Sequence, residues 1–562
     1  MNHYKIQIDN IYWERIQLFI EGHTNDIDIK NKKVILRNLT ETKEVEANEV
    51  IIEDDKYKAR FNIAILDDGN YLPTGQYLVI FKGDLDYIAH VDQALLDPLN
   101  YDLDDKQLER YDSFETINGK KNYLLNNFKH QFKKSGDSKT ISYIVTPKIS
   151  KEVNEFVLDI KFNKPRPKES IVSHKIKDIK KKYNKNSFKF RDFLFKLIFK
   201  ATKFFNMKKG NTVLFTSDSR PAMSGNFEFI YNEMLRQNLD KKYEIHSMFK
   251  SNISSRRKFI DKFKFPYLLG KADYIFLDDF HPLLYNMKFR KNQEIIQVWH
   301  AVGAFKTVGF SRTGKKGGPF FDSVNHRNYT KVTVSSENDI PFYGEAFGVK
   351  EQNIIPTGVP RTDIFFDENY KNKIITQMEN ALPIIKGKKV ILFAPTFRGN
   401  GHKTAHYPFF KIDFVRFARY CHETNTVVLF KMHPFVKNRL NIPKEYEQYF
   451  VDVSDYREVN DLLFVTDILI SDYSSLVYEF ALFKRPMLFY AFDLEDYVTS
   501  RDFYEPYESF VPGKIVESFE ELIIALDNED YEEEKVVPFL NKHFKYQDGK
   551  SSERVVRNIF SC

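Results

Sequence analysis

The sequence contains very little cysteine, with Cys421 and Cys562 as its two thiols in 562 residues. Two thiols so far apart cannot build a disulfide framework or a cysteine-based metal site, which fits a reducing compartment. No stretch approaches the roughly 18 apolar residues that a membrane-spanning helix needs. The first ten residues, MNHYKIQIDN, also lack a basic segment followed by an apolar one. We therefore expect neither a signal peptide nor a helix that crosses a membrane.

Several motifs of phosphate-handling and redox enzymes are absent as well. No Gly-x-x-x-x-Gly-Lys-Ser/Thr sequence is present, which excludes a nucleoside triphosphatase of the usual kind. No Gly-x-Gly-x-x-Gly sequence follows a predicted strand, so dinucleotide redox chemistry is not expected. Neither His-Glu-x-x-His nor Cys-x-x-Cys occurs. We therefore expect a protein that works without a bound metal or cofactor.

The composition is that of a folded protein with several domains. Apolar residues make up 42% and charged residues 29%, which excludes wholesale disorder. The length suggests about three or four domains. The net charge of +7 is concentrated, because residues 164–209 hold 16 Lys and Arg against three acidic residues. A nucleic-acid-binding protein usually spreads such charge over a folded face, so no nucleic-acid partner is expected.

Residues 1–160 are predicted to form a β-rich N-terminal domain. Short runs of alternating or apolar residues, such as 16–20 and 77–81, are separated by turn signals and are typical of a small β-sandwich. A polar stretch around residues 100–140 is expected to be a long loop or an insertion. No group of potentially catalytic residues stands out here, and we expect a docking or spacing module.

Residues 161–210 are predicted to form a basic linker with an amphipathic helix. A charge cluster at residues 175–185 precedes a segment in which apolar residues recur at three- and four-residue spacing. This pattern is typical of a helix that lies on a membrane surface, where each Lys or Arg near an anionic leaflet contributes about 1 kcal/mol. The alternative is a helix that packs on the next domain and leaves a solvated basic rim. The residues on the apolar face are Phe190, Phe193, Leu194, Leu197 and Ile198.

From residue 211 onward, strands of the buried type alternate with helices, which indicates parallel sheets with crossover helices. Two sets of strands predict two doubly wound α/β domains, residues 211–375 and residues 376–562 with C-terminal helices. Ligands of such sheets bind beyond the carboxyl ends of the strands. We therefore expect a site in the cleft between the two domains.

Unusual polar residues follow five of the predicted strands. A lone histidine at a strand end is more often structural than catalytic, but five such ends in one α/β region favour a shared site. Ser474-Ser475 precedes a predicted helix and offers either an ordinary N-cap or a phosphate site. Arg361 and Arg398 suit bidentate phosphate contacts. The histidines His300 and His433 could supply a base and a phosphate-binding partner. These residues predict an enzyme that acts on a phosphate or diphosphate ester.

In combination, these motifs resemble the CDP-glycerol glycerophosphotransferase family, the teichoic-acid polymerases and primases of Gram-positive bacteria. The run at residues 298–312 differs from the Trp-His-Gly-Thr-Pro form of many glycerol-phosphate enzymes. It looks like that of the staphylococcal poly(ribitol phosphate) polymerases of wall teichoic acid, as do residues 11–15, 215–220 and 502–507. The family motifs are Trp299-His300, residues 358–363, 394–398, 431–434 and 471–475, and Glu479.

The resemblance implies a GT-B-like pair of Rossmann-type domains. It also implies transfer of ribitol phosphate from CDP-ribitol to a polyprenyl-diphosphate-linked teichoic acid acceptor, with release of CMP, at the anionic cytoplasmic face of the membrane. His300 would be the general base and His433 would contact the diphosphate. The substrate-binding residues implied by the resemblance are Trp299, Ala301, Val302, Gly303, Arg361, Pro395, Thr396, Arg398, Met432, Pro434, Ser474, Ser475 and Glu479, the last as a partner of the ribose.

Three other functions remain open from the sequence. The donor could be CDP-glycerol, or the enzyme could add a single unit. A nucleotide-sugar glycosyltransferase could share the same architecture. A non-catalytic scaffold could use the basic linker to bind polyanions at a membrane, although the five polar strand ends argue against it.

Overall fold

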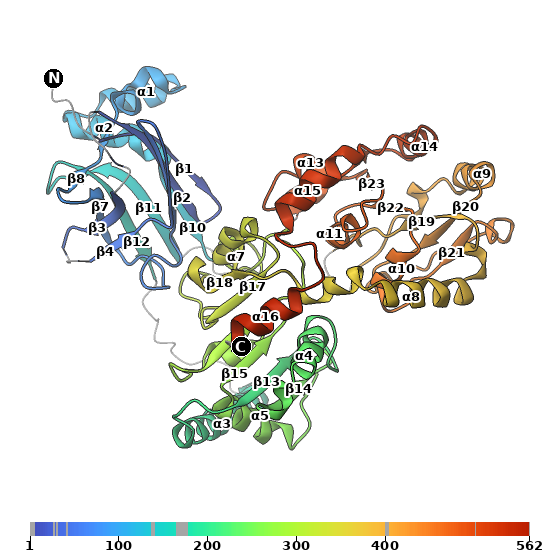
Figure 1. Ribbon diagram of the computed structural model, residues 1–562. Coiled ribbons are helices and arrows are strands. Elements are labelled where there is room, and N and C mark those ends of the chain that lie inside the picture. Colours follow the sequence, from blue (N-terminus) through green and yellow to red (C-terminus); the bar gives the residue numbers. More distant parts are fainter. Residues whose placement is uncertain are drawn as a thin grey trace.

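The computed structural model describes residues 6–25, 29, 32–40, 43–135, 141–164, 178–253, 255–399, 404–500 and 502–560. For residues 178–188 and 499–500 it describes the course of the helix alone. Within these ranges the chain forms four β-sheets that follow one another along the sequence (Figure 1). The first two are mainly antiparallel and the last two are parallel.

The first two sheets, from residues 6–163, share one hydrophobic core. Residues 100–135, within the stretch expected to be a long loop or an insertion, contain two helices and a strand, so they are not simply a long loop. The helix α1 buries none of its side chains. Asp104 and Gln107 cap it through reciprocal hydrogen bonds of 2.8 and 2.9 Å. The elements are β1 (Ile6–Glu14), β2 (Gln17–Thr24), β3 (Lys33–Asn38), β4 (Glu44–Glu46), β5 (Glu49–Glu53), β6 (Lys56–Asn62), β7 (Gly75–Lys82), β8 (Tyr87–Ile88), β9 (His90–Val91), α1 (Asp105–Asp112), α2 (Ile117–Leu125), β10 (His130–Lys133), β11 (Ser142–Ile149) and β12 (Phe156–Asn163).

The two remaining sheets are parallel, as the alternation of strands and helices predicts, and each has six strands. The first has the order β14-β13-β15-β16-β17-β18 and the second β21-β20-β19-β22-β23-β24. We call the regions built around them the first lobe and the second lobe. The strands of the first are β13 (Thr212–Ser217), β14 (Glu244–Phe249), β15 (Tyr274–Leu277), β16 (Glu294–Gln297), β17 (Lys331–Val334) and β18 (Ile354–Pro356). Those of the second are β19 (Lys389–Phe393), β20 (Thr426–Phe430), β21 (Phe450–Asp452), β22 (Ile468–Ser471), β23 (Met487–Tyr490) and β24 (Lys514–Val516).

Helices connect these strands and cover the sheets (Figure 1). They are α4 (Asn226–Arg236), α5 (Asp261–Lys271), α6 (Pro282–Tyr285), α7 (Ile340–Phe347), α8 (Glu368–Ala381), α9 (Phe414–Thr424), α10 (Val459–Phe464), α11 (Leu476–Ala481), α12 (Leu494–Ser500), α13 (Tyr507–Phe510), α14 (Phe519–Asp527), α15 (Val536–His543) and α16 (Ser551–Phe560).

The predicted amphipathic helix is present as α3 (Asp178–Phe205), which packs along α5. Phe199 is buried in the core of the first lobe. Residues 165–177, which include Lys175 of the predicted charge cluster, lie outside the described residues. In the described part of the chain, no helix combines the length and the apolar character needed to span a bilayer. Unlike Phe199, several apolar side chains of α3 are exposed: Phe190, Phe193, Leu197, Phe204 and Phe205.

The last helix, α16, returns to the first lobe, although its place in the sequence assigns it to the second. Figure 1 shows this red helix beside the green strands β13 and β15. Val555, Val556 and Ile559 belong to the same core as those strands. Asp363 accepts hydrogen bonds of 2.8 Å from the backbone N–H groups of Ser551 and Ser552 and so fixes where the helix begins. The sequence shows an apolar face on this helix but not which sheet covers it.

The N-terminal sheets dock on α7 of the first lobe through a buried ion pair. Arg15 Nε lies 2.7 Å from Glu345 Oε1, and Gln17 donates a hydrogen bond of 2.9 Å to the other carboxylate oxygen. Glu345 is fully buried. Arg60 makes a second ion pair of 2.9 Å with Glu351. These contacts hold the N-terminal module against the lobe that carries His300.

We expect Arg15→Ala to lower the free energy of unfolding by about 3 kcal/mol, because Glu345 would remain buried without its cationic partner. The exposed pair of Lys33 and Glu46, with 66% and 52% of the side chains exposed, provides a matched control. Lys33→Ala should change stability by less than about 1 kcal/mol. Urea unfolding of both variants measures the difference, and equal losses would contradict this account of the docking.

Candidate active site

Two neighbouring cavities lie beyond the carboxyl ends of the two parallel sheets. The β16 cavity, about 410 Å³, lies where β16 ends, and the β20 cavity, about 260 Å³, lies at the ends of β19, β20 and β22. Arg361 and Ser475 line both, so the cavities adjoin at these two residues. This is the place at which parallel sheets bind ligands.

The structure brings most of the predicted site residues to these cavities. The β16 cavity has Trp299, His300, Ala301 and Gly303 in its wall. The β20 cavity has Pro395, Thr396, Met432, His433, Pro434, Ser474 and Glu479. Of the predicted residues, Val302 and Arg398 take other positions.

A strained turn presents His300 at the end of β16. Trp299 has a φ of +48°, in the left-handed region that a bulky residue adopts only when its surroundings enforce it. Gln297 Oε1 accepts a hydrogen bond of 2.9 Å from Trp299 N, and Asn226 Nδ2 donates one of 2.8 Å to Trp299 O. The turn leaves 46% of the His300 side chain exposed at the cavity.

The backbone selects the tautomer of neutral His300. Its Nδ1 lies 3.2 Å from the carbonyl oxygen of Asp278. Because a carbonyl oxygen can only accept, Nδ1 carries the hydrogen and Nε2 keeps a free lone pair. The carboxylate of Asp279 lies 3.8 Å from the same Nδ1. This arrangement suits a proton acceptor at Nε2.

His433 is held in the opposite tautomer. The backbone N–H of Phe435 donates a hydrogen bond of 3.1 Å to His433 Nδ1, so in the neutral ring the hydrogen is on Nε2. Burial, together with the positive charges of Lys306 and Lys431, lowers the pKa of His433 to about 4. At neutral pH the ring is therefore uncharged and offers an N–H donor to the β20 cavity.

Cationic side chains that the sequence analysis did not select also line the site. Lys306 contributes to the β16 cavity, and its Nζ donates a hydrogen bond of 2.8 Å to the Tyr497 hydroxyl of the second lobe. Lys431 and Arg457 line the β20 cavity. Lys306 lies in the run after β16, and Lys431 directly precedes Met432. Their positions within the family motifs could have identified both lysines as site residues from the sequence. The positive lining suits a polyphosphate ligand.

An ion pair connects the two lobes at the junction of the cavities. Arg361 Nη2 contacts Glu479 Oε1, and Glu479 is buried in α11. Burial raises the pKa of the Glu479 carboxyl, and Arg361 opposes this shift. Arg361 Nε and Glu479 Oε2 are buried without a hydrogen-bond partner among the described residues. Such atoms at a cavity wall suit contact with a polar ligand.

The two serines before α11 have different roles. Ser474, one residue before the N-cap, accepts through Oγ a hydrogen bond of 3.2 Å from the backbone N–H of Leu476, which closes the turn before the helix. Ser475 is exposed, makes no capping hydrogen bond and lines both cavities. One hydroxyl therefore stabilises the turn, and the other is available at the junction.

Val302 is a core residue and lines neither the β16 cavity nor the β20 cavity. It is 1% exposed and belongs, with Phe305, to the hydrophobic core of the second lobe. Gly303 between them fits closely, because a Cβ there would lie 2.4 Å from the ring of Tyr478. The loop after His300 is thus inserted into the opposite lobe, which the sequence pattern of the loop does not reveal.

Arg398 also differs from its predicted role in phosphate binding. Its Nη1 lies 2.9 Å from Asp472 Oδ2, and its Nη2 lies 2.9 Å from Asp493 Oδ1. Burial lowers the pKa of Arg398, but these carboxylates outweigh burial, hold the pKa above its usual value and occupy donors of the guanidinium. Asp472 also accepts a hydrogen bond of 2.7 Å from Thr396 N. Arg398 therefore fixes the loop that carries Thr396.

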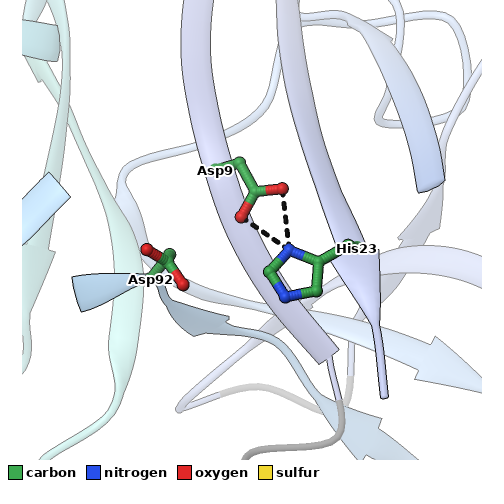
Figure 2. Close-up of side chains that lie close together, drawn as sticks. All are labelled: Asp9, His23 and Asp92. Atoms are coloured by element: carbon green, nitrogen blue, oxygen red, sulfur yellow. Dashed lines mark hydrogen bonds and ion pairs between the residues drawn. The ribbon is translucent and has the colours of Figure 1, made fainter. Parts of the chain in front are cut away.

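A separate group of potential metal ligands lies in the N-terminal sheets. Figure 2 shows Asp9, His23 and Asp92, whose ligand atoms lie within 4.8 Å of one another. It is the sole group of this kind in the part of the chain that the structure describes. His23 Nδ1 is already hydrogen-bonded to Asp9 at 2.8 Å, and Asp92 accepts a hydrogen bond of 2.7 Å from Ala94 N. Asp9 and His23 thus form a polar link between β1 and β2, and Asp92 caps the 3₁₀ turn that follows it.

Comparison with known proteins places the chain in a family. Residues 198–561 match the family described as CDP-Glycerol:Poly(glycerophosphate) glycerophosphotransferase. The chain is 66% identical to the teichoic acid ribitol-phosphate polymerase TarL of Staphylococcus aureus, over 99% of each chain. It is 64% identical to TarK of the same organism, over 91% of this chain and 99% of that protein.

The fold also matches a solved structure. The wall teichoic acid polymerase TagF is 23% identical to this chain and aligns with a TM-score of 0.55, over 69% of this chain and 98% of that one. This likeness supports the arrangement of the lobes, while the sequence matches establish the relationship. The chain belongs to the CDP-glycerol:poly(glycerophosphate) glycerophosphotransferase family.

Proposed function

We propose that this chain is a ribitol-phosphate polymerase of wall teichoic acid synthesis. It transfers ribitol phosphate from CDP-ribitol to a polyprenyl-diphosphate-linked acceptor and releases CMP. The observation that carries the proposal is the pair of histidines in opposite tautomers, one in each of two adjoining cavities. The choice of ribitol rests on the high identity to TarL and TarK, which are named ribitol-phosphate polymerases.

In the proposed reaction His300 Nε2 accepts the proton of the acceptor's terminal hydroxyl. The hydroxyl oxygen forms a bond to the β-phosphorus of CDP-ribitol, and the bond from that phosphorus to the bridging oxygen breaks. CMP leaves with the bridging oxygen. The Nε2–H of His433 donates to the diphosphate, and the nearby Lys306 and Lys431 stabilise the charge that develops on the leaving group. These positive groups are why we propose a mechanism that needs no metal ion.

The donor is proposed to occupy the β20 cavity. Glu479 Oε2, buried and without a hydrogen-bond partner in the part of the chain that the structure describes, is placed to accept a hydrogen bond from a ribose hydroxyl. Arg361 and the Ser475 hydroxyl at the junction would contact the diphosphate. The remaining wall is formed by Pro395, Thr396, Met432, Pro434 and Ser474, and the acceptor would enter along Trp299, Ala301 and Gly303.

Replacement of the proposed base tests the reaction. We expect His300→Ala to lower the rate of CMP release from CDP-ribitol by more than about 100-fold, the usual contribution of a general base. His246→Ala, at an exposed pair with Glu244, is the matched control and should remain active. A folded His300→Ala enzyme with near-normal turnover would exclude the base assignment.

The same assay tests the donor and the metal independence. CDP-ribitol and CDP-glycerol are compared in parallel with a lipid-linked primer. Release with CDP-glycerol alone would keep the family and overturn the ribitol donor. We expect turnover to survive EDTA; a loss that Mg²⁺ restores would contradict a mechanism without metal.

The neutral state of His433 predicts a specific pH dependence of donor binding. A histidinium contact with an ordinary pKa near 6.5 would weaken as the pH rises through that value. Because the pKa of His433 is lowered to about 4, its contribution should stay constant between about pH 5.5 and 7.5. Calorimetric titration of CDP-ribitol into His300→Ala and into His300→Ala/His433→Ala measures this contribution. A ratio of dissociation constants that shrinks toward one as the pH rises would contradict the assignment.

We further propose that the enzyme is a peripheral protein of the cytoplasmic membrane face and that residues 161–210 dock it there. These residues connect the predicted domain 1–160 to the predicted domains 211–375 and 376–562. An apolar groove of about 530 Å³ lies between α3 and the segment that leads into α5. Phe259, which lines this groove, and the neighbouring Ile260 are each 73% exposed. Residues 189–209 hold seven Lys or Arg against one acidic residue, and residues 256–264 hold five against one. Exposed aromatic side chains with a basic surround suit an anionic bilayer surface.

Vesicle sedimentation tests this docking. We expect binding to require anionic lipid, to fall with added salt, and to be weakened several-fold by Phe190→Ser/Phe193→Ser. Phe410→Ser, at an 84% exposed residue of the second lobe, is the matched control. Unchanged sedimentation of the double variant would locate the membrane contact elsewhere.

A further inference from the structure

Asn226 joins the two reacting halves of the site through its side chain alone. It is the first residue of α4 and is 2% exposed. Its Nδ2 donates hydrogen bonds to the carbonyl oxygens of Val298, at 3.2 Å, and Trp299, at 2.8 Å. Its Oδ1 accepts a hydrogen bond of 3.0 Å from the backbone N–H of Arg361. Both donor hydrogens of this buried amide and its carbonyl oxygen are therefore directed at two separate backbone segments.

The first segment is the strained turn before His300. A positive φ at a bulky residue such as Trp299 is strained and persists only where the surroundings enforce it. Asn226 donates to the carbonyl oxygen of Trp299 and to that of the preceding residue, and Gln297 accepts from the Trp299 N–H. The direction of the turn sets where the His300 ring lies, because His300 is the next residue.

The second segment carries Arg361, in the helical turn Pro360–Phe366. The Arg361 guanidinium contacts Glu479 of the second lobe, beside the β20 cavity. One side chain thus fixes the spacing between the proton acceptor of one cavity and the cation at the entrance of the other.

We propose that Asn226 is a positioning residue, which fixes where His300 and Arg361 lie relative to each other for the phosphate transfer. This inference rests on the proposed function and adds a residue that touches neither substrate. Asparagine suits the role because it both donates and accepts. Aspartate would keep the acceptor for Arg361 N but would place a carboxylate against two carbonyl oxygens.

The two contacts can be separated by substitution. In Asn226→Asp we expect kcat to fall about 10- to 100-fold, since a displacement of about 1 Å at the base costs that much, while KM for the CDP-alditol stays within about threefold. In Asn226→Ala we expect the same fall in kcat and a rise in KM, because both contacts are lost. Asn211→Asp is the matched control, since Asn211 donates a similar hydrogen bond of 3.0 Å to Lys242 O far from the cavities. It should leave both constants unchanged.

A double-mutant cycle distinguishes positioning from a merely structural role. If Asn226 acts through His300, Asn226→Asp should cause no further loss of kcat in the His300→Ala enzyme. The same fold loss in both backgrounds would overturn the proposal, and so would a change confined to KM. If aspartate lowers the unfolding midpoint strongly, the cycle is repeated with Asn226→Ala.

A ligand-free measurement keeps this inference separate from the proposed function. In protein labelled with ¹⁵N-histidine, the His300 signal is identified by its loss in His300→Ala. We expect protonation at Nδ1 in the wild type and a mixture of tautomers in Asn226→Asp. An inactive wild type with this NMR difference would overturn the proposed reaction alone. If the wild type is active and Asn226→Asp changes neither the His300 signal nor kcat, the positioning role alone is overturned.

Discussion

The ion pair between Arg361 and Glu479 is the contact on which the arrangement of the site depends. Arg361 comes from the segment that leaves the first lobe, and Glu479 is buried in the second. A carboxylate without a cationic partner at this depth would be strongly destabilised, so the two lobes must meet at this point. The adjoining cavities and the facing strand ends follow from that meeting. The loop with Val302 and Phe305, inserted in the second lobe, reinforces it.

Backbone groups, rather than other side chains, assign the two histidines their hydrogens. A carbonyl oxygen holds the hydrogen of His300 on Nδ1, and a peptide N–H leaves the hydrogen of His433 on Nε2. The same imidazole group can therefore accept a proton in one cavity and donate a hydrogen bond in the other. Polyphosphate chemistry needs both functions at once, one at the nucleophile and one at the leaving group.

The remaining parts of the chain support this centre from outside. The N-terminal sheets dock through Arg15 on the lobe that carries His300, and α16 returns from the second lobe to cover the first sheet. Arg398, although largely buried near the β20 cavity, forms ion pairs with Asp472 and Asp493 and holds the loop that carries Thr396. The site is thus formed by few ligand-facing groups on a framework of buried polar contacts.

The sequence by itself determined the alternation of strands and helices, the polar residues at the strand ends and the family motifs. These are local properties, because a buried parallel strand is mostly apolar and the polar residues of the site follow it directly. Only the tertiary structure decided that Val302 enters a core, that Arg398 is neutralised by carboxylates distant in sequence, and that α16 changes lobe. It also revealed Asn226, whose partners lie 72 to 135 residues away in the chain. Such contacts are fixed by packing between segments that meet only in the folded protein, and no periodicity in the sequence encodes which segments meet.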